Sequence, residues 1–274
     1  MERKDILLSN GRTISFEITR QPGRGAFFIL GVRKSGSSVL NQMCAALSQF
    51  NNYKFVDVAG IMFNNNITVR SWANDPVINE LLTEGNVYGG FRVMPFAFSK
   101  SSIFRSAKKV LLIRDPRDAL VSEYFSNAYS HVIPAASGDR AEVNRQMTEL
   151  REKALNTNIE DSVLSMAPNL NRTILGYSSV CRDAATLLLK YENVILDKRR
   201  LIESICTHFG WNVNEQLITN ILGWADVIPP KEDQKAFVRK VVPGDHKEKL
   251  SQKTISKLNR MLKPAMELLG YDPA

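Results

Sequence analysis

Residues 31–38, GVRKSGSS, place two cations among small residues, between an apolar run and a stretch with helical spacing. Backbone N–H groups at the start of a helix converge on one point, and the helix dipole favours negative charge there. The small residues would let the backbone approach a phosphate closely, and the serine hydroxyls would add donors. The two cations favour an anion-binding loop over a simple strand-to-helix turn. The predicted contacts are Arg33, Lys34, Ser35, Gly36, Ser37 and Ser38.

The lysine of this loop is not where a nucleoside-triphosphate loop has it. In the GxxxxGK[ST] motif the lysine directly follows the second glycine. Here Gly31 and Gly36 keep the spacing of the glycines, but Ser37 follows them and the cation moves to Lys34. Its ammonium would lie beside the terminal group of a ligand whose first phosphate occupies the helix N-terminus. A P-loop kinase or NTPase is therefore an alternative that the sequence disfavours.

A second cluster, IRDPRDALVSEYF at 113–125, follows another apolar run. Arg114 ends the run, Asp115 is placed to cap a helix, and Pro116 suits the first helical turn. An arginine at a strand end and Ser122 on the following helix can hold a second phosphate. A rival interpretation, in which Asp115 binds magnesium, is disfavoured for two reasons. Cations flank this residue on both sides, and the upstream loop lacks the lysine that follows the second glycine in a nucleoside-triphosphate loop.

Both clusters must be positioned by strands and helices that alternate along the chain. Short apolar runs predict buried strands at 26–32, 53–60, 86–93, 108–115 and 185–195. The alternation predicts a single α/β domain with a central parallel sheet flanked by helices, like that of the P-loop nucleotide hydrolases. Polar and apolar residues alternate around Asn10-Gly11, which predicts a β-hairpin within residues 1–20.

Together the two clusters resemble the motifs of sulfotransferases that use 3′-phosphoadenosine 5′-phosphosulfate (PAPS). GVRKSGSS is similar to their 5′-phosphosulfate loop, particularly to the Arg-Lys form of the heparan-type branch. The second cluster is similar to their 3′-phosphate motif, which implies that Arg114 and Ser122 bind the ribose 3′-phosphate. Residues 237–250 resemble the C-terminal segment that folds over the cofactor. The resemblance covers a catalytic core of about 26–265, and from the C-terminal segment it adds Arg239, Lys240 and Gly244 to the cofactor contacts.

The resemblance implies transfer of a sulfuryl group from PAPS to a hydroxyl or amine, with 3′-phosphoadenosine 5′-phosphate (PAP) as product. Charge would build on the leaving phosphate, so Lys34 is the predicted catalytic cation, and no metal is required. Many members carry the general base in a Thr-His-x-Pro string, but the corresponding FRVMP at 91–95 has no histidine. The heparan-type branch instead uses a glutamate near the end of the second strand, where this chain has Asp57, so the resemblance implies Asp57 as the general base. His131 is an alternative base.

The sequence does not define the acceptor. Residues 60–100 and 126–180 fall outside the cofactor motifs and would line its pocket. They hold apolar side chains that suggest a lipid-like acceptor but would equally fill a core: Phe63, Trp72, Phe91, Met94, Phe96 and Phe98. Trp72 could also stack on adenine, as an aromatic residue does elsewhere in the family. We expect a small-molecule, lipid or carbohydrate acceptor; an inactive fold that still binds nucleotide is an alternative.

Composition limits the remaining possibilities. The net charge of +8 and pI of about 9.4 would suit nucleic acid, an anionic membrane or a polyanionic ligand, but no recognition motif supports a nucleic-acid partner. Three widely spaced cysteines lack the spacing of a zinc site and indicate reduced thiols. No apolar run has the length of a membrane span or of a signal-peptide core, so the expected location is the cytoplasm.

Overall fold

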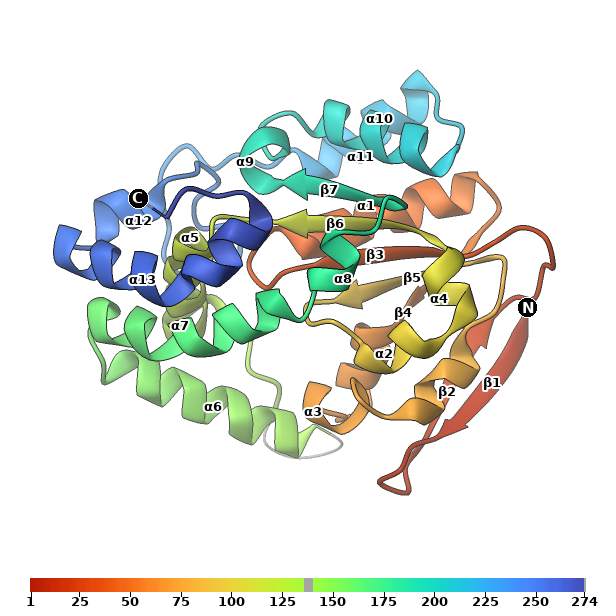
Figure 1. Cartoon of the computed structure of the whole chain (residues 1–274), viewed down its shortest axis with the longest axis horizontal. Helices are drawn as coiled ribbons and strands as arrows, with labels where there is room; N and C mark the ends of the chain where they lie inside the picture. Colours follow the sequence, from red (N-terminus) through yellow and green to blue (C-terminus); the bar gives the residue numbers. More distant parts are fainter. Residues whose placement is uncertain (136–139, 274) are drawn as a thin grey trace.

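The centre of the computed structural model, which describes residues 1–135 and 140–273, is a five-stranded sheet (Figure 1). All neighbouring strands are parallel, in the order β4–β5–β3–β6–β7, which confirms the predicted fold class. The strands are β3 at Phe27–Gly31, β4 at Lys54–Asp57, β5 at Asn86–Phe91, β6 at Lys108–Ile113 and β7 at Thr186–Lys190. Because β3 and β6 pair with Gly31 opposite Leu112, the loops that follow them leave the same edge of the sheet.

The predicted N-terminal hairpin is also present, as antiparallel strands β1 (Glu2–Leu7) and β2 (Thr13–Ile18). The Leu8 N–H donates to the Arg12 carbonyl at 2.9 Å, so three residues form the turn, and Gly11 takes a φ of 82° within it. A three-residue turn that ends in this left-handed conformation is a common hairpin connection. The apolar face of the hairpin is buried in the core, through Ile6, Ile14, Phe16 and Ile18.

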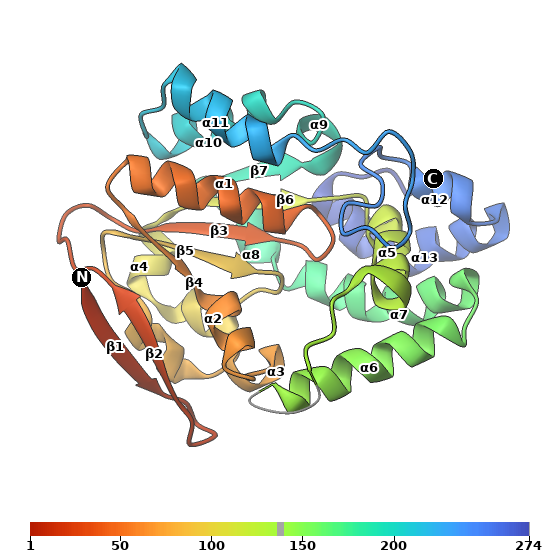
Figure 2. The same ribbon diagram turned by 180° about the vertical axis from the view of Figure 1, so that it is seen from behind.

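Both faces of the sheet are covered, as the continuous apolar strands require. Along β3, Phe27 and Ile29 point into one core, whereas Phe28 and Leu30 point into the other. Figure 2 shows the first face, which is covered by α1 (Ser37–Phe50), α10 (Lys198–Phe209) and α11 (Glu215–Ala225). The other face carries the hairpin and the helices α5 (Pro116–Phe125), α7 (Ile159–Leu175) and α13 (Gln252–Leu269).

Two strands end three or more residues before the end of the predicted run. The run at 53–60 is strand only to Asp57, because the Asp57 carboxylate accepts the Gly60 N–H at 2.9 Å and caps α2 (Val58–Asn64). The run at 185–195 leaves the sheet after Lys190 and continues as the short helix α9 (Tyr191–Val194). Apolar patterning alone does not separate the end of a buried strand from the first turn of a buried helix.

The remaining elements connect these layers. Helix α5 continues into one π-helical turn, η3 (Ser126–Ser130). The others are α3 (Val69–Trp72), η1 (Pro76–Leu81), η2 (Phe96–Lys100), α4 (Ser102–Ser106), α6 (Ala141–Leu155), α8 (Ser178–Cys181) and α12 (Asp245–Lys249). Within the described residues, the helices are too short or too polar for any of them to cross a membrane.

Candidate functional site

The loop after β3 ends in an open helix start at the carboxyl edge of the sheet. Gly36 precedes α1 with a φ of 87°, and among the described residues no side chain caps this helix. The first N–H groups of an α-helix have no partner within the helix, so they are free for an anion. A Cβ on Gly36 would also lie 3.4 Å from the Tyr191 ring, so both backbone conformation and space favour glycine here.

Lys34 occupies a strained position in this loop, with a φ of 65° that residues other than glycine rarely adopt. Its ammonium donates to the Ser126 hydroxyl at 2.6 Å, so the lysine reaches across to the π-helical turn η3. Burial lowers the pKa of Lys34, Glu123 opposes this shift, and the neighbouring arginines add to it, so that the pKa is about 8. Lys34 is therefore half-buried, charged at neutral pH and held by Ser126, on the loop that leads into the open start of α1.

The serines of the loop divide into two roles. Ser35 is fully buried and donates its hydroxyl to the carbonyls of Val32 and Leu112, so this donor braces the loop against β6 instead of facing a ligand. Ser37 and Ser38 form the first turn of α1, where their N–H groups have no helical partner. The Ser38 hydroxyl accepts from Arg92 at 3.2 Å, a cation that the sequence analysis did not identify.

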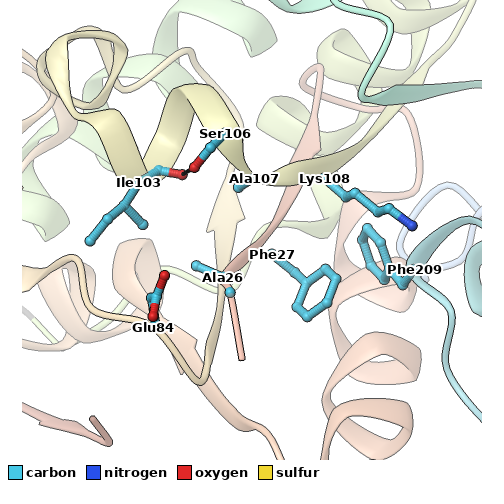
Figure 3. A pocket seen from close by; sticks show the side chains of 9 residues that line it. Ala26, Phe27, Glu84, Ile103, Ser106, Ala107, Lys108 and Phe209 are labelled. Atoms are coloured by element: carbon cyan, nitrogen blue, oxygen red, sulfur yellow. Dashed lines mark hydrogen bonds between the residues drawn. The ribbon is translucent and has the colours of Figure 1, made fainter. Parts of the chain in front are cut away.

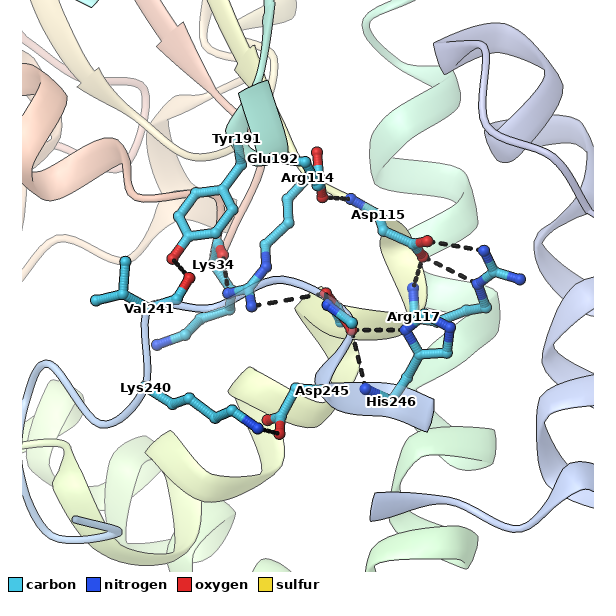
Figure 4. Close-up of polar contacts among 12 residues, drawn as sticks. Lys34, Arg114, Asp115, Arg117, Tyr191, Glu192, Lys240, Val241, Asp245 and His246 are labelled. Atoms are coloured by element: carbon cyan, nitrogen blue, oxygen red, sulfur yellow. Dashed lines mark hydrogen bonds and ion pairs between the residues drawn. The ribbon is translucent and has the colours of Figure 1, made fainter. Parts of the chain in front are cut away.

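Arg114 links the two motifs that the sequence singled out. Its side chain is buried, donates to the Lys34 carbonyl at 3.3 Å and lies 4.4 Å from the centre of the Tyr191 ring (Figure 4). Its Nε has no hydrogen-bond partner in the described chain, although the atom is buried. Buried donors are nearly always satisfied, so an unpaired guanidinium nitrogen indicates a place for an acceptor. Ser122, one turn beyond Asp118 on α5, is half-buried and has no side-chain partner among the described residues.

The loop before α12 is joined to Arg114 by a buried carboxylate. Asp118 accepts the Gly244 N–H at 2.7 Å, the His246 N–H at 2.9 Å and the His246 ring nitrogen at 2.6 Å. The oxygen that accepts the Gly244 N–H also lies 3.8 Å from the Arg114 guanidinium. Burial alone would raise the pKa of Asp118, but these hydrogen bonds and the Arg114 charge outweigh it and lower the pKa to about 2. The carboxylate is thus ionised under ordinary conditions.

The two cations predicted in the C-terminal segment are already paired. Arg239 is buried against Glu232 and Asp245 and lies 4.2 Å from the centre of the Phe125 ring. Lys240 donates to Asp245 at 3.1 Å and to Glu248 at 2.6 Å. The structure brings this segment to the same edge as Arg114, where a phosphate would have to compete with these carboxylates for its cations.

The two candidate bases have different surroundings. Asp57 is exposed and its carboxylate caps α2. His131 follows η3 and is fixed at its backbone, since its N–H donates to the Ser126 carbonyl at 2.9 Å and its carbonyl accepts from Arg151. Within the described residues, neither of its ring nitrogens has a hydrogen-bond partner. Burial, followed by the charges of Lys34 and nearby arginines, lowers the pKa of His131 to about 4. The imidazole is therefore neutral at physiological pH.

Asp115 does not have the surroundings of a metal ligand. One of its oxygens accepts the backbone N–H and Nε of Arg117 at 2.9 and 3.0 Å, and the other accepts the second guanidinium nitrogen at 2.7 Å. Its own N–H donates to Glu192 at 2.8 Å. This residue caps α5 as predicted, and both of its oxygens are used inside the fold.

Most of the aromatic residues proposed for an acceptor pocket fill the core instead. Trp72 is 1% exposed and packs with its ring centre 6.2 Å from that of Phe91. It is therefore not available to stack on adenine, because the core already covers both of its faces. Met94 and Phe98 are buried in the same way, whereas Phe63 and Phe96 are exposed.

A small cavity of about 210 Å³ lies at the opposite edge of the sheet, around Phe27 and Lys108 where β3 and β6 begin (Figure 3). Its polar side chains are occupied, since Lys108 donates to the His208 carbonyl at 2.7 Å and Glu84 accepts the Gly23 N–H at 2.6 Å. In open parallel sheets, ligands bind at the carboxyl ends of the strands. The candidate site is therefore the edge that carries Lys34 and Arg114.

Comparison with known proteins gives the family and the fold of this chain. The family described as "Sulfotransferase domain" matches residues 24–270. A guinea pig (Cavia porcellus) 3-beta-hydroxysteroid sulfotransferase is 24% identical over 191 residues, which cover 64% of this chain and 61% of that protein, so the chain spans less than two thirds of this relative. The mouse sulfotransferase SULT7A1, solved in complex with PAP, is similar in fold with a TM-score of 0.59 and 13% identity, over 91% of this chain and 85% of that one.

Proposed function

Because the chain belongs to the sulfotransferase domain family, we propose that it transfers a sulfuryl group from PAPS to a hydroxyl or amine acceptor. The observation that carries the proposal is the geometry of Lys34. Its ammonium projects from a strained turn beside an uncapped helix start, and its carbonyl is bonded to Arg114 at 3.3 Å. A cation in this place suits the phosphate from which a sulfuryl group departs.

The residues present fit a donor with two separate phosphates. The open N–H groups at Ser37 and Ser38 and the ammonium of Lys34 would hold the 5′-phosphosulfate. Arg114, with its unpaired buried Nε, would hold the 3′-phosphate together with Ser122. We include Arg239 and Lys240 in this second site. The PAP bound to the mouse relative supports this nucleotide class.

The proposed reaction exchanges the S–O bond between sulfur and the 5′-phosphate of the donor for a new S–O or S–N bond to the acceptor. The acceptor atom bonds to sulfur, the bond from sulfur to the 5′-phosphate breaks, and its electron pair stays on the phosphate oxygen. Lys34 would stabilise this growing charge from its fixed position, and one such donor is worth about 3–4 kcal/mol of transition-state stabilisation. The acceptor gives up its proton to a base.

We propose His131 as this base in preference to Asp57. The imidazole is neutral, has free ring nitrogens within the described chain, and follows the same turn whose Ser126 hydroxyl binds Lys34. Asp57 instead caps α2. Asp57→Asn would keep this cap, because asparagine caps helices as well as aspartate. We expect kcat to fall by roughly 10²–10⁴-fold in His131→Gln and by less than about threefold in Asp57→Asn. A larger loss of kcat in Asp57→Asn than in His131→Gln would instead favour Asp57 as the base.

The function is tested by transfer of ³⁵S-labelled sulfate from PAPS to a panel of small-molecule acceptors. The panel holds phenols, a 3β-hydroxysteroid, fatty alcohols, amines and amino sugars. We expect labelled product with at least one class, and competition by PAP that magnesium–ATP does not match. Binding of PAP without transfer to any acceptor would favour an inactive nucleotide-binding fold, and hydrolysis of magnesium–ATP would favour the kinase or NTPase alternative.

A further inference from the structure

The two halves of the proposed 3′-phosphate site come from distant parts of the chain and meet at one side chain. Arg114 ends β6, whereas residues 239–246, which we call the C-terminal loop, precede and enter α12. Asp118 on α5 contacts both, through Gly244 and His246 on one side and Arg114 on the other. This carboxylate is 1% exposed.

We propose that Asp118 is a positioning residue that holds the C-terminal loop against Arg114, so that recognition of a 3′-phosphate depends on it. The inference rests on the proposed function. It assigns to Asp118 no contact with the nucleotide. Its role is to fix the distance between the strand-end guanidinium and the loop cations.

The charges of the loop explain why such a tether is needed. Arg239 and Lys240 are paired with Glu232, Asp245 and Glu248. Since these carboxylates neutralise the loop cations, the loop has little electrostatic attraction for the remainder of the site before a nucleotide binds. Two backbone N–H groups and one imidazole nitrogen of the loop donate to Asp118 instead. Hydrogen bonds to a charged acceptor stabilise a structure more than hydrogen bonds between neutral groups.

A second, weaker link runs parallel to the first. Tyr191 lies against the Arg114 guanidinium with its ring, and its hydroxyl donates to the Val241 carbonyl at 2.8 Å. The loop is therefore held at both ends, at Val241 through Tyr191 and at Gly244 to His246 through Asp118. Both links lead back to Arg114.

Electrostatics and positioning predict opposite effects for removal of the Asp118 charge. A carboxylate beside a phosphate site repels the phosphate, so a purely electrostatic role predicts that Asp118→Asn binds PAP more tightly. A positioning role predicts weaker binding, because the asparagine NH₂ group would face N–H donors of the loop. We expect the Kd of Asp118→Asn for PAP to rise by about 10- to 100-fold, and its Kd for 5′-AMP, which lacks the 3′-phosphate, to change by less than about threefold.

Asp75→Asn is the matched control. Asp75 is likewise buried and accepts two backbone N–H groups, from Ser9 and Val77, and the Ser9 hydroxyl, but it lies at the N-terminal hairpin. We expect its ratio of Kd values for PAP and 5′-AMP to equal that of the wild type. Tyr191→Phe removes only the hydroxyl link and should reduce PAP binding by about three- to tenfold, which keeps the proposal testable if Asp118→Asn does not fold.

Isothermal titration calorimetry with PAP and 5′-AMP measures both ratios, and thermal unfolding reports the folded fraction of each variant. Unchanged or tighter PAP binding in folded Asp118→Asn, or unchanged binding in Tyr191→Phe, would overturn the inference. An equal loss for both nucleotides would also overturn it, because that is the result of a general structural defect. If wild-type protein fails to bind PAP, the proposed function fails instead.

Discussion

Replacement of Arg114 by lysine isolates the guanidinium geometry from its charge. Lysine keeps one positive charge but lacks the planar guanidinium group. In the wild type this group donates to the Lys34 carbonyl at 3.3 Å, lies 3.8 Å from Asp118 and has an unpaired Nε. A single ammonium does not reach the loop carbonyl and a 3′-phosphate together. Loss of one charge-assisted hydrogen bond costs about 1.5–3 kcal/mol, so we expect roughly 10- to 100-fold weaker PAP binding.

The assay is calorimetric titration of PAP and 5′-AMP at one fixed ionic strength, since phosphate binding depends on salt. Arg117→Lys serves as the control, because Arg117 lies at the same helix start but is engaged by Asp115 and Asn259. We expect Arg114→Lys to lose affinity for PAP alone, and Arg117→Lys to retain affinity for both nucleotides. PAP binding within twofold of the wild type in Arg114→Lys would refute the assignment of the 3′-phosphate to this arginine.

Three further predictions follow from the site. The reaction needs the charged form of Lys34, whose pKa in the free enzyme is about 8, so kcat/KM for the donor should fall by about tenfold per pH unit above pH 8. His131, with a pKa of about 4, should cause no loss of kcat/KM between pH 8 and pH 5. A rise in kcat/KM above pH 8 would contradict the role of Lys34. The pKa of Asp118 falls from 3.8 to about 2 on folding, so its carboxylate should contribute about 2 kcal/mol to the free energy of unfolding above pH 3.8 and lose this contribution as the pH falls towards 2. Urea unfolding of the wild type and Asp118→Asn across this range measures the difference between their free energies of unfolding, which should vanish at the acidic end. Gly36→Ala should weaken PAP binding or lower stability by about 1–2 kcal/mol through its left-handed φ of 87°, and unchanged binding and unfolding midpoint would contradict the strain.

The parts of the fold that follow from local patterning were predictable. The buried strands β3 and β6 are short apolar runs, and each is followed by small or capping residues that begin a helix. Asp115 caps α5 as its position before Pro116 indicates. The boundaries after Asp57 and Lys190 were missed because buried strand and buried helix have the same apolar character over a few residues.

The contacts that assemble the site were not predictable, because they join residues that lie far apart in the sequence. Lys34 and Ser126 are 92 residues apart, and Asp118 and Gly244 are 126 apart. No periodicity or motif in one sequence specifies such a pairing. The sequence predicted which cations would bind the cofactor, but it carried no sign that Arg239 and Lys240 are neutralised by neighbouring carboxylates. For the same reason, core packing of Trp72 was indistinguishable from stacking on a nucleotide.

The central claim is that Lys34 stabilises the phosphate that the sulfuryl group leaves. It is tested most directly by the rate of ³⁵S transfer from PAPS in wild type and Lys34→Ala, with saturating donor and an acceptor found in the panel, and with the PAP affinity of both proteins measured in parallel. We predict a loss of roughly 10²–10³-fold in kcat, with PAP affinity retained within about tenfold. Full activity in Lys34→Ala would contradict the account.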